Sequence, residues 1–252
     1  MTTADTTYRI HAPYPEWLVR GQANTIEAKI YDASGDLIAP GDASTVTVYD
    51  DSNVKIVDAA SATIVGSVAR YTIAAVDLPS SLDIGDGWRI EWDLPIGGNP
   101  SQMFVRAASL VRSFLYPTVV SADLQARHQN LSRLIATGND ADDFITTAWE
   151  VLVRMLLKAG RMPWLILSPF ALHDALVFKS LELIFRDGHA AAGDGKFSEL
   201  AEHYAEQFAH EWSSITFDYD FNEDGQADTD ERASTEAIIF TGGPGVPTNW
   251  VN

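Results

Sequence analysis

One acidic segment late in the chain has the residue types and spacing of a calcium-binding loop. Counted from Asp220, oxygen-bearing side chains stand at positions 1, 3, 5, 9 and 12, and a glycine stands at position 6. The candidate ligands are Asp220, Asn222, Asp224, Gln226, Asp228 and Glu231. EF-hand loops have this spacing, because Ca²⁺ takes six to eight hard oxygens and the glycine permits the sharp turn. The sequence therefore predicts that residues 220–231 hold Ca²⁺ as a structural brace, with no other cofactor.

An acidic, solvated turn remains open as the alternative reading of this segment. Ala227 stands at the eighth position, where such loops have a larger aliphatic residue. The strand-like run Ala237-Ile-Ile-Phe240 follows where an exiting helix is expected. The sequence holds no second loop of this kind, so a paired calcium switch is not expected.

Two histidines and two glutamates share one face of a helix expected over 197–212. Glu199, His203, Glu206 and His210 follow one another at spacings of four, three and four residues. At a rise of 1.5 Å per residue the two histidines lie about 10 Å apart along the axis, too far to bind one metal ion. We therefore expect these four side chains to form a solvated face of the helix.

The sequence shows no motif that is typical of catalysis. The absence of cysteine excludes thiolate chemistry and thiolate metal sites. Gly193-Asp-Gly-Lys196 matches a phosphate-binding loop only in part, because Ala190 and Phe197 replace residues that such a loop requires. We expect that the protein is not an enzyme.

The charge of the chain argues against a nucleic-acid-gripping surface. The 252 residues carry 35 acidic and 17 basic side chains, a net charge of −18. Twelve of the acidic residues and one basic residue lie between Glu199 and Glu236. Such a face would repel phosphates, or would be solvated or dock a basic partner. No membrane segment is expected, since Pro163 and Pro169 interrupt the most apolar stretch.

Residues 1–112 have the apolar period of β-strands. Apolar residues alternate with polar ones in the runs Ile26, Ala28, Ile30 and Trp88, Ile90, Trp92. A period of two indicates strands with one buried face, and glycine-rich turns separate the runs. We predict an antiparallel β-sandwich or barrel-like domain over 1–112, which makes the whole chain α+β.

From residue 113 the apolar period becomes helical. We expect helices over 121–136, 139–160, 169–188 and 197–212, with Gly160 and Gly188 closing the second and third. The third is apolar on most sides and is expected at the centre of the bundle. The sequence thus predicts a small helical domain over 113–236 that includes the acidic loop 220–231.

Glycine and proline dominate the end of the chain, and an extended tail is predicted over 237–252. Its apolar residues are candidates to contact a partner: Ile238, Ile239, Phe240, Trp250 and Val251. The alternative is a disordered chain end that binds no partner.

Four short runs in the helical half occur in a familiar order. They are Leu110 to Leu124 (LVRSFLYPTVVSADL), Asp142-Asp143-Phe144, Arg186-Asp187-Gly188 and Tyr219 to Gly225 (YDFNEDG). In this pattern of elements the chain from Leu110 to Glu231 resembles the head–tail connector (adaptor or head-completion) proteins of tailed phages. The β-rich first half departs from the all-helical members and resembles an added docking or decoration domain.

The resemblance implies a structural protein of the virion neck that is assembled in the host cytoplasm. It implies a homo-oligomer, usually a dodecameric ring, that binds the portal protein and a tail or stopper protein. DNA would pass through its channel without specific binding. The alternative function is a calcium-dependent module that binds a glycan or a protein.

Overall fold

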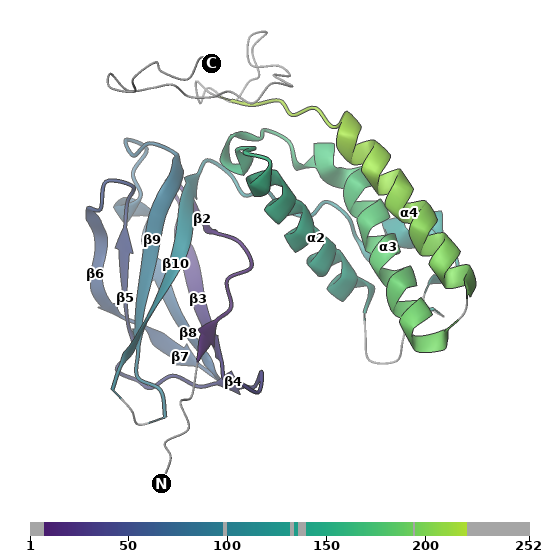
Figure 1. Ribbon diagram of the computed structural model, residues 1–252. Coiled ribbons are helices and arrows are strands. Elements are labelled where there is room, and N and C mark those ends of the chain that lie inside the picture. The colour runs from purple at the N-terminus through teal and green to yellow at the C-terminus, as the bar shows by residue number, and fades with distance from the viewer. Residues whose placement is uncertain (1–7, 98–99, 132–133, 136–139, 194, 221–252) are drawn as a thin grey trace, which may run out of the picture.

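A computed structural model describes residues 8–97, 100–131, 134–135, 140–193 and 195–220 of the chain. A β domain comes first and a helical domain follows (Figure 1). The strands are β1 (Arg9–Ile10), β2 (Glu16–Val19), β3 (Asn24–Tyr31), β4 (Leu37–Ile38), β5 (Thr45–Tyr49), β6 (Lys55–Ser61), β7 (Thr63–Val65), β8 (Val68–Ile73), β9 (Gly85–Leu94) and β10 (Gln102–Val111). The helices are α1 (Ser121–Arg127), α2 (Ala141–Lys158), α3 (His173–Ala192) and α4 (Gly195–Ser214), with single 3-10 turns η1 (Ala75–Asp77), η3 (Pro163–Leu165) and η4 (Pro169–Leu172). The predicted α+β class is confirmed.

The β domain is a sandwich of two sheets, and buried and exposed side chains alternate along its long strands as predicted. One sheet has the order β1-β3-β8-β7, with β4 beside β3, and the other has the order β2-β10-β9-β5-β6. The residues of β3 and β9 that alternate in the sequence are buried between the sheets: Ile26, Ala28, Ile30, Trp88, Ile90 and Trp92. The period of two therefore places these side chains in one apolar core.

One strand pair departs from the predicted antiparallel pattern. After β1 has paired with β3, the chain crosses to the other sheet, where β2 runs parallel to β10 with Val19 opposite Val111. Asn24 fixes the turn that follows, because the Val19 N–H donates to its Oδ1 at 2.7 Å and its Nδ2 donates to the Val19 carbonyl at 2.9 Å. The resulting order of strands corresponds to that of immunoglobulin-like sandwiches.

Local signals place both ends of α2 correctly. The Asp142 N–H donates to Asp140 Oδ1 at 3.3 Å, and the Asp140 N–H donates to Asp143 Oδ2 at 3.1 Å, which forms a capping box. Gly160 adopts a φ of 68° just after the last helical residue. Its left-handed conformation ends the helix, as predicted.

The predicted end of the first helix is wrong. α1 stops at Arg127 instead of continuing to residue 136. His128 leaves the helix with extended backbone angles, and its ring packs edge-on against Phe185 at 5.0 Å between centroids. The α-helix therefore ends where His128 contacts α3, and Leu131 belongs to a separate turn in which the Leu134 N–H donates to the Leu131 carbonyl at 2.9 Å.

The predicted end of the third helix is also wrong. α3 passes through Gly188 and ends at Gly193, which has a φ of 67°. Gly188 is buried where α3 approaches α4, and a Cβ built on it would lie 3.7 Å from the ring of Phe197. Gly188 therefore lies at a helix–helix contact.

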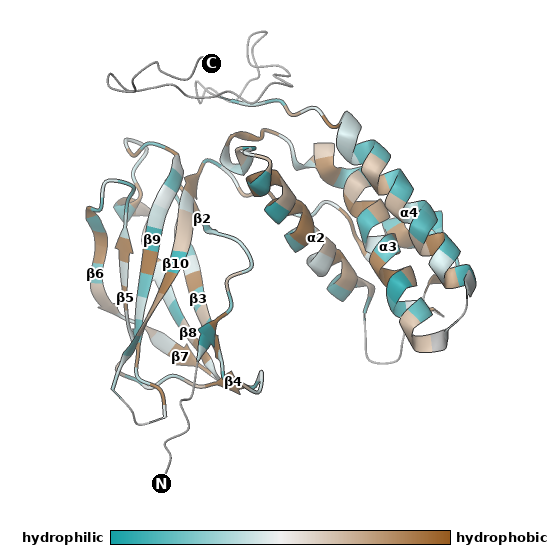
Figure 2. Ribbon diagram, in the orientation of Figure 1, coloured by the Kyte–Doolittle hydropathy of each residue, from teal (hydrophilic) through white to brown (hydrophobic). Residues whose placement is uncertain are grey.

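The three long helices form one layer in which α3 is central, as predicted (Figure 1). Tyr204 of α4 stacks on Phe185 at 5.5 Å and on Phe178 at 6.4 Å, so aromatic rings fill the contact between α3 and α4. Hydrophilic residues lie along the outer side of α4 (Figure 2). None of the helices in the described ranges is long and apolar enough to cross a membrane.

Candidate functional site

The two domains meet on the outer face of the β2–β10 strand pair. Trp17, Val19 and Val111 point out of the sandwich and belong to the apolar cluster of the helical domain. Their strand neighbours Leu18 and Leu110 point the other way, into the core between the sheets. β2 and β10 thus contribute one set of side chains to the core of the sandwich and the other set to the core that they share with the helices.

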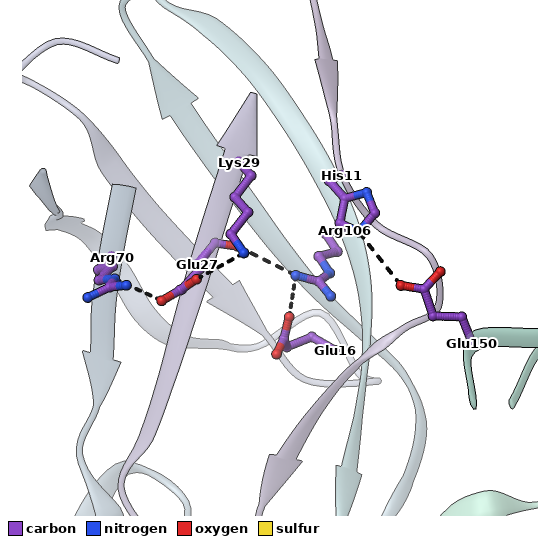
Figure 3. Close-up of polar contacts among 7 residues, drawn as sticks. All are labelled: His11, Glu16, Glu27, Lys29, Arg70, Arg106 and Glu150. Atoms are coloured by element: carbon purple, nitrogen blue, oxygen red, sulfur yellow. Dashed lines mark hydrogen bonds and ion pairs between the residues drawn. The ribbon is translucent and has the colours of Figure 1, made fainter. Parts of the chain in front are cut away.

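A group of charged residues lies at the edge of the sandwich where the chain changes sheets (Figure 3). Its members are His11, Glu16, Glu27, Lys29, Arg70, Arg106 and Glu150. Arg106 forms an ion pair with Glu16 across β10 and β2. Glu27 of β3 receives Arg70 Nε at 2.8 Å and Lys29 Nζ at 3.8 Å. The group therefore joins strands of both sheets.

The same group extends to the helical domain. His11 Nε2 lies 4.0 Å from Glu150 Oε1 on α2. The ring of Tyr14 packs against that of Trp17 at an interplanar angle of 36°, with 5.4 Å between centroids, directly beside the apolar interface of the domains. A polar contact and an aromatic contact thus reinforce the junction from the segment between β1 and β2.

Tyr14 and all members of the charged group except Arg70 line an open cavity of about 290 Å³. Burial raises the pKa of Glu16 above its ordinary value, although the guanidinium of Arg106 partly opposes that shift. Burial also raises the pKa of the Tyr14 hydroxyl. The carboxylates of Glu16 and Glu27 already face cationic groups. The cavity therefore has the character of a structural ion-pair network, and a ligand would have to displace these pairs to bind.

The ion pair of Arg106 with Glu16 lies at a strand edge. In the described part of the chain, β10 pairs with β9 along its length but with β2 only from Ala108 onward. An open strand edge can pair with a foreign strand, and inward-pointing charges discourage this. Arg106 and Glu16 are placed at that edge, so we interpret them as a guard against unwanted strand addition.

The structure describes only the first ligand of the predicted calcium loop. Asp220 is 3% exposed, its carboxylate forms an ion pair with Arg112, and its N–H donates to the carbonyl of Leu165 at 3.1 Å. Tyr219 forms an antiparallel bridge with Ile166. A metal ion would have to compete with Arg112 for Asp220.

The other ligands, Asn222, Asp224, Gln226, Asp228 and Glu231, lie outside the described residues, as do the tail residues Ile238, Ile239, Phe240, Trp250 and Val251. Within the described ranges no group of three His, Asp or Glu side chains is placed to hold a metal ion. The calcium site and the tail contacts stay predictions.

The histidines and glutamates of α4 lie on a solvated face, as predicted. Glu199, His203, Glu206 and His210 are all exposed, while Tyr204 and Phe208 on the opposite side are buried.

Sequence reasoning missed one buried carboxylate at the centre of the helical layer. Glu182 of α3 is 2% exposed. Lys179 Nζ lies 3.0 Å from one of its oxygens and Arg186 Nη2 lies 2.9 Å from the other. The sequence does contain a signal for this arrangement: a lysine three residues before Glu182 and an arginine four residues after it lie on the same face of a helix.

No protein-family model matches the chain, and no curated protein matches it in a sequence search.

Proposed function

We propose that this protein is a structural component of a tailed-phage virion, one subunit of an oligomeric ring that joins the portal of the head to the tail. The ring, with twelve copies as its expected number, extends the channel through which DNA passes. The segment from Leu110 to Glu231, which resembles connector proteins, supplies the helical wedge of each subunit.

The observation that carries this proposal is the acidic outer face of α4. Glu199, Glu202 and Glu206 are exposed on the helix that lies beyond α3, on the side away from the β domain (Figure 1). No lysine or arginine occurs from Glu199 to Asp220. A channel wall of this charge repels the phosphate backbone, so DNA slides along it without being held.

The packing of the domains supports a mechanical role. The sandwich and the helices share buried side chains at Trp17, Val19 and Val111, and charged contacts flank that junction. A subunit that transmits load between a head and a tail needs such a buried junction, because the two halves must not separate when a neighbour pulls on one of them.

Mass measurement and imaging of the purified full chain test the proposal. We expect a ring by electron microscopy, alone or after mixing with a portal protein, and an acidic bore in a reconstruction. A chain that stays monomeric and does not bind the portal would contradict the proposal. A ring with a basic bore would contradict the part assigned to α4.

Deletion of residues 237–252 tests the tail separately. If the tail engages the portal or an adjacent subunit, particles that carry the truncated protein will fail at head–tail joining, whereas normal joining would remove the tail from the proposal. The β domain of the truncated protein serves as an internal control for folding.

Calorimetry tests the predicted calcium loop. Ca²⁺ binding to residues 220–231 requires Asp220, which Arg112 now neutralises. The Arg112→Gln variant should therefore bind Ca²⁺ more tightly than the natural chain. No heat of binding at millimolar Ca²⁺ in either protein would end the calcium hypothesis.

A further inference from the structure

Three cations lie together where α2 ends. Arg154 and Lys158 are exposed and stand one turn apart on α2, and Arg161 follows just after the helix. None of the three forms an ion pair within the part of the chain that the structure describes, and Glu150, one turn before Arg154, lies 4.0 Å from His11 instead. The helix dipole favours a cation in the last turn, but it acts little on Arg154. We call Arg154, Lys158 and Arg161 the basic end of α2.

The chain that follows α4 passes this end of α2 (Figure 1). Leu156 and Ala159 of α2 line a small cavity of about 70 Å³ together with Ile215 and Phe217. Arg161 lies over the ring of Phe217, with 5.8 Å between its Cζ and the ring centroid. The segment after α4 therefore contacts the basic end directly.

The backbone pairing at Asp220 gives the direction in which this segment leaves. Tyr219 forms an antiparallel bridge with Ile166, and the Asp220 N–H donates to the Leu165 carbonyl at 3.1 Å. In an antiparallel pair, one chain advances as its partner runs back towards lower residue numbers. The direction of the chain at Asp220 therefore leads back towards Arg161.

The residues that come next in the sequence carry the opposite charge. Residues 221–231 contain five carboxylates and no lysine or arginine. The acids are Glu223, Asp224, Asp228, Asp230 and Glu231. Because Asp220 is held in place, this segment is tethered beside the basic end at an effective concentration on the order of millimolar. Exposed ion pairs, which are weak between separate molecules, are then sufficient to hold it.

We infer that residues 221–231 dock on the basic end of α2 in the same chain, with their carboxylates paired to Arg154, Lys158 and Arg161. The ion pair of Asp220 with Arg112 is the first, observed contact of this series. A foreign anion would have to displace a tethered one, so this segment is the occupant. Docking uses the same carboxylates as the predicted calcium loop and therefore competes with Ca²⁺. The inference does not depend on the connector function.

A distance measurement between two spin labels on the full chain tests the docking. The chain contains no cysteine, so Thr147→Cys and Ala227→Cys carry the only two labels. Thr147 is exposed on α2 outside the basic end, and Ala227 lies among the acids without being one of the candidate calcium ligands. In pulsed electron paramagnetic resonance without calcium, the docked segment should give a narrow distance distribution.

Charge variants of the labelled protein identify the partners. Arg154→Gln with Lys158→Gln should lower the ratio of docked to free segment by about tenfold and broaden the distribution. High salt should have the same effect on the natural charges. Arg9→Gln is the matched control, because Arg9 is an exposed arginine outside the basic end. Circular dichroism verifies that each variant keeps its fold.

An exchange of charge gives the decisive result. Arg154→Glu with Lys158→Glu should abolish docking, and adding Asp224→Lys with Asp228→Lys in the same chain should restore the narrow distribution. A broad distribution with the natural charges, a narrow one that the basic-end variants leave unchanged, or a failure of the exchange to restore docking would overturn the inference. A narrow distribution that appears only after Ca²⁺ is added would show that the metal orders the segment, and would also overturn it.

Discussion

The two glycines at the end of α3 give the sharpest test of how this helical domain is built. Gly188 is inside the helix, and a Cβ there would meet the Phe197 ring at 3.7 Å, an ordinary van der Waals distance. Alanine restricts the unfolded chain and favours a helix, so Gly188→Ala should raise the free energy of unfolding by about 0.5–1 kcal/mol. Gly193 has a φ of 67°, in the left-handed region that a Cβ disfavours. Gly193→Ala should therefore lower the free energy of unfolding by about 1 kcal/mol.

Urea titration followed by circular dichroism at a helix-sensitive wavelength measures both changes. The expected difference between the variants is about 1.5–2 kcal/mol, which exceeds the error of such a comparison when the two variants have similar dependences of the unfolding free energy on urea concentration. Each variant is the control for the other, since both add one methyl group within the same helical end. A loss of stability in Gly188→Ala as large as that in Gly193→Ala would refute the reasoning. It would mean that the helix ends at Gly188 or that α4 is packed too closely to admit a Cβ.

Three further measurements probe buried polar groups. Glu182→Gln should lower the free energy of unfolding by about 1–3 kcal/mol because it leaves the largely buried ammonium of Lys179 without its counter-ion, and an additional Lys179→Met change should restore part of the loss. Ser109→Ala should raise stability by up to about 1 kcal/mol, since Ser109 Oγ is buried with no hydrogen-bond partner among the described residues, and a loss would indicate an unseen partner. Carbon-detected NMR should give Glu16 a pKa above 4.5, and a still higher pKa in the Arg106→Gln variant. The contribution of Glu16 to stability should fall as the pH rises from 4.5 through the pKa of the folded state. An ordinary pKa in both proteins would contradict the burial of Glu16.

Short-range signals were enough to predict the classes of structure. The period of two in β3 and β9 and the helical period after residue 113 are properties of neighbouring residues, so they can be identified without knowing the fold. The same is true of the capping box at Asp140 and the helix end at Gly160, where the physical cause lies within one turn of chain.

Features that depend on distant segments could not be predicted in this way. Gly188 looks like a helix end, but the approach of Phe197 from α4 makes it a packing residue. Glu182 is an acidic residue of a type that usually lies on the surface, and it is buried only because α2 and α4 cover α3. The parallel pairing of β2 with β10 requires the chain to cross from one sheet to the other, and the hydrophobic pattern of the sequence does not indicate such a crossing.

The sequence by itself determined the α+β class, the order of a β domain and a helical domain, and the concentration of acidic charge from Glu199 onward. Only the tertiary structure decided that one of these carboxylates is buried and paired with a cation, because Asp220 meets Arg112 across 108 positions of chain. Periodicity and charge are carried by residues that are close in sequence, whereas an ion pair of this kind exists only after both domains have packed and removed one carboxylate from water.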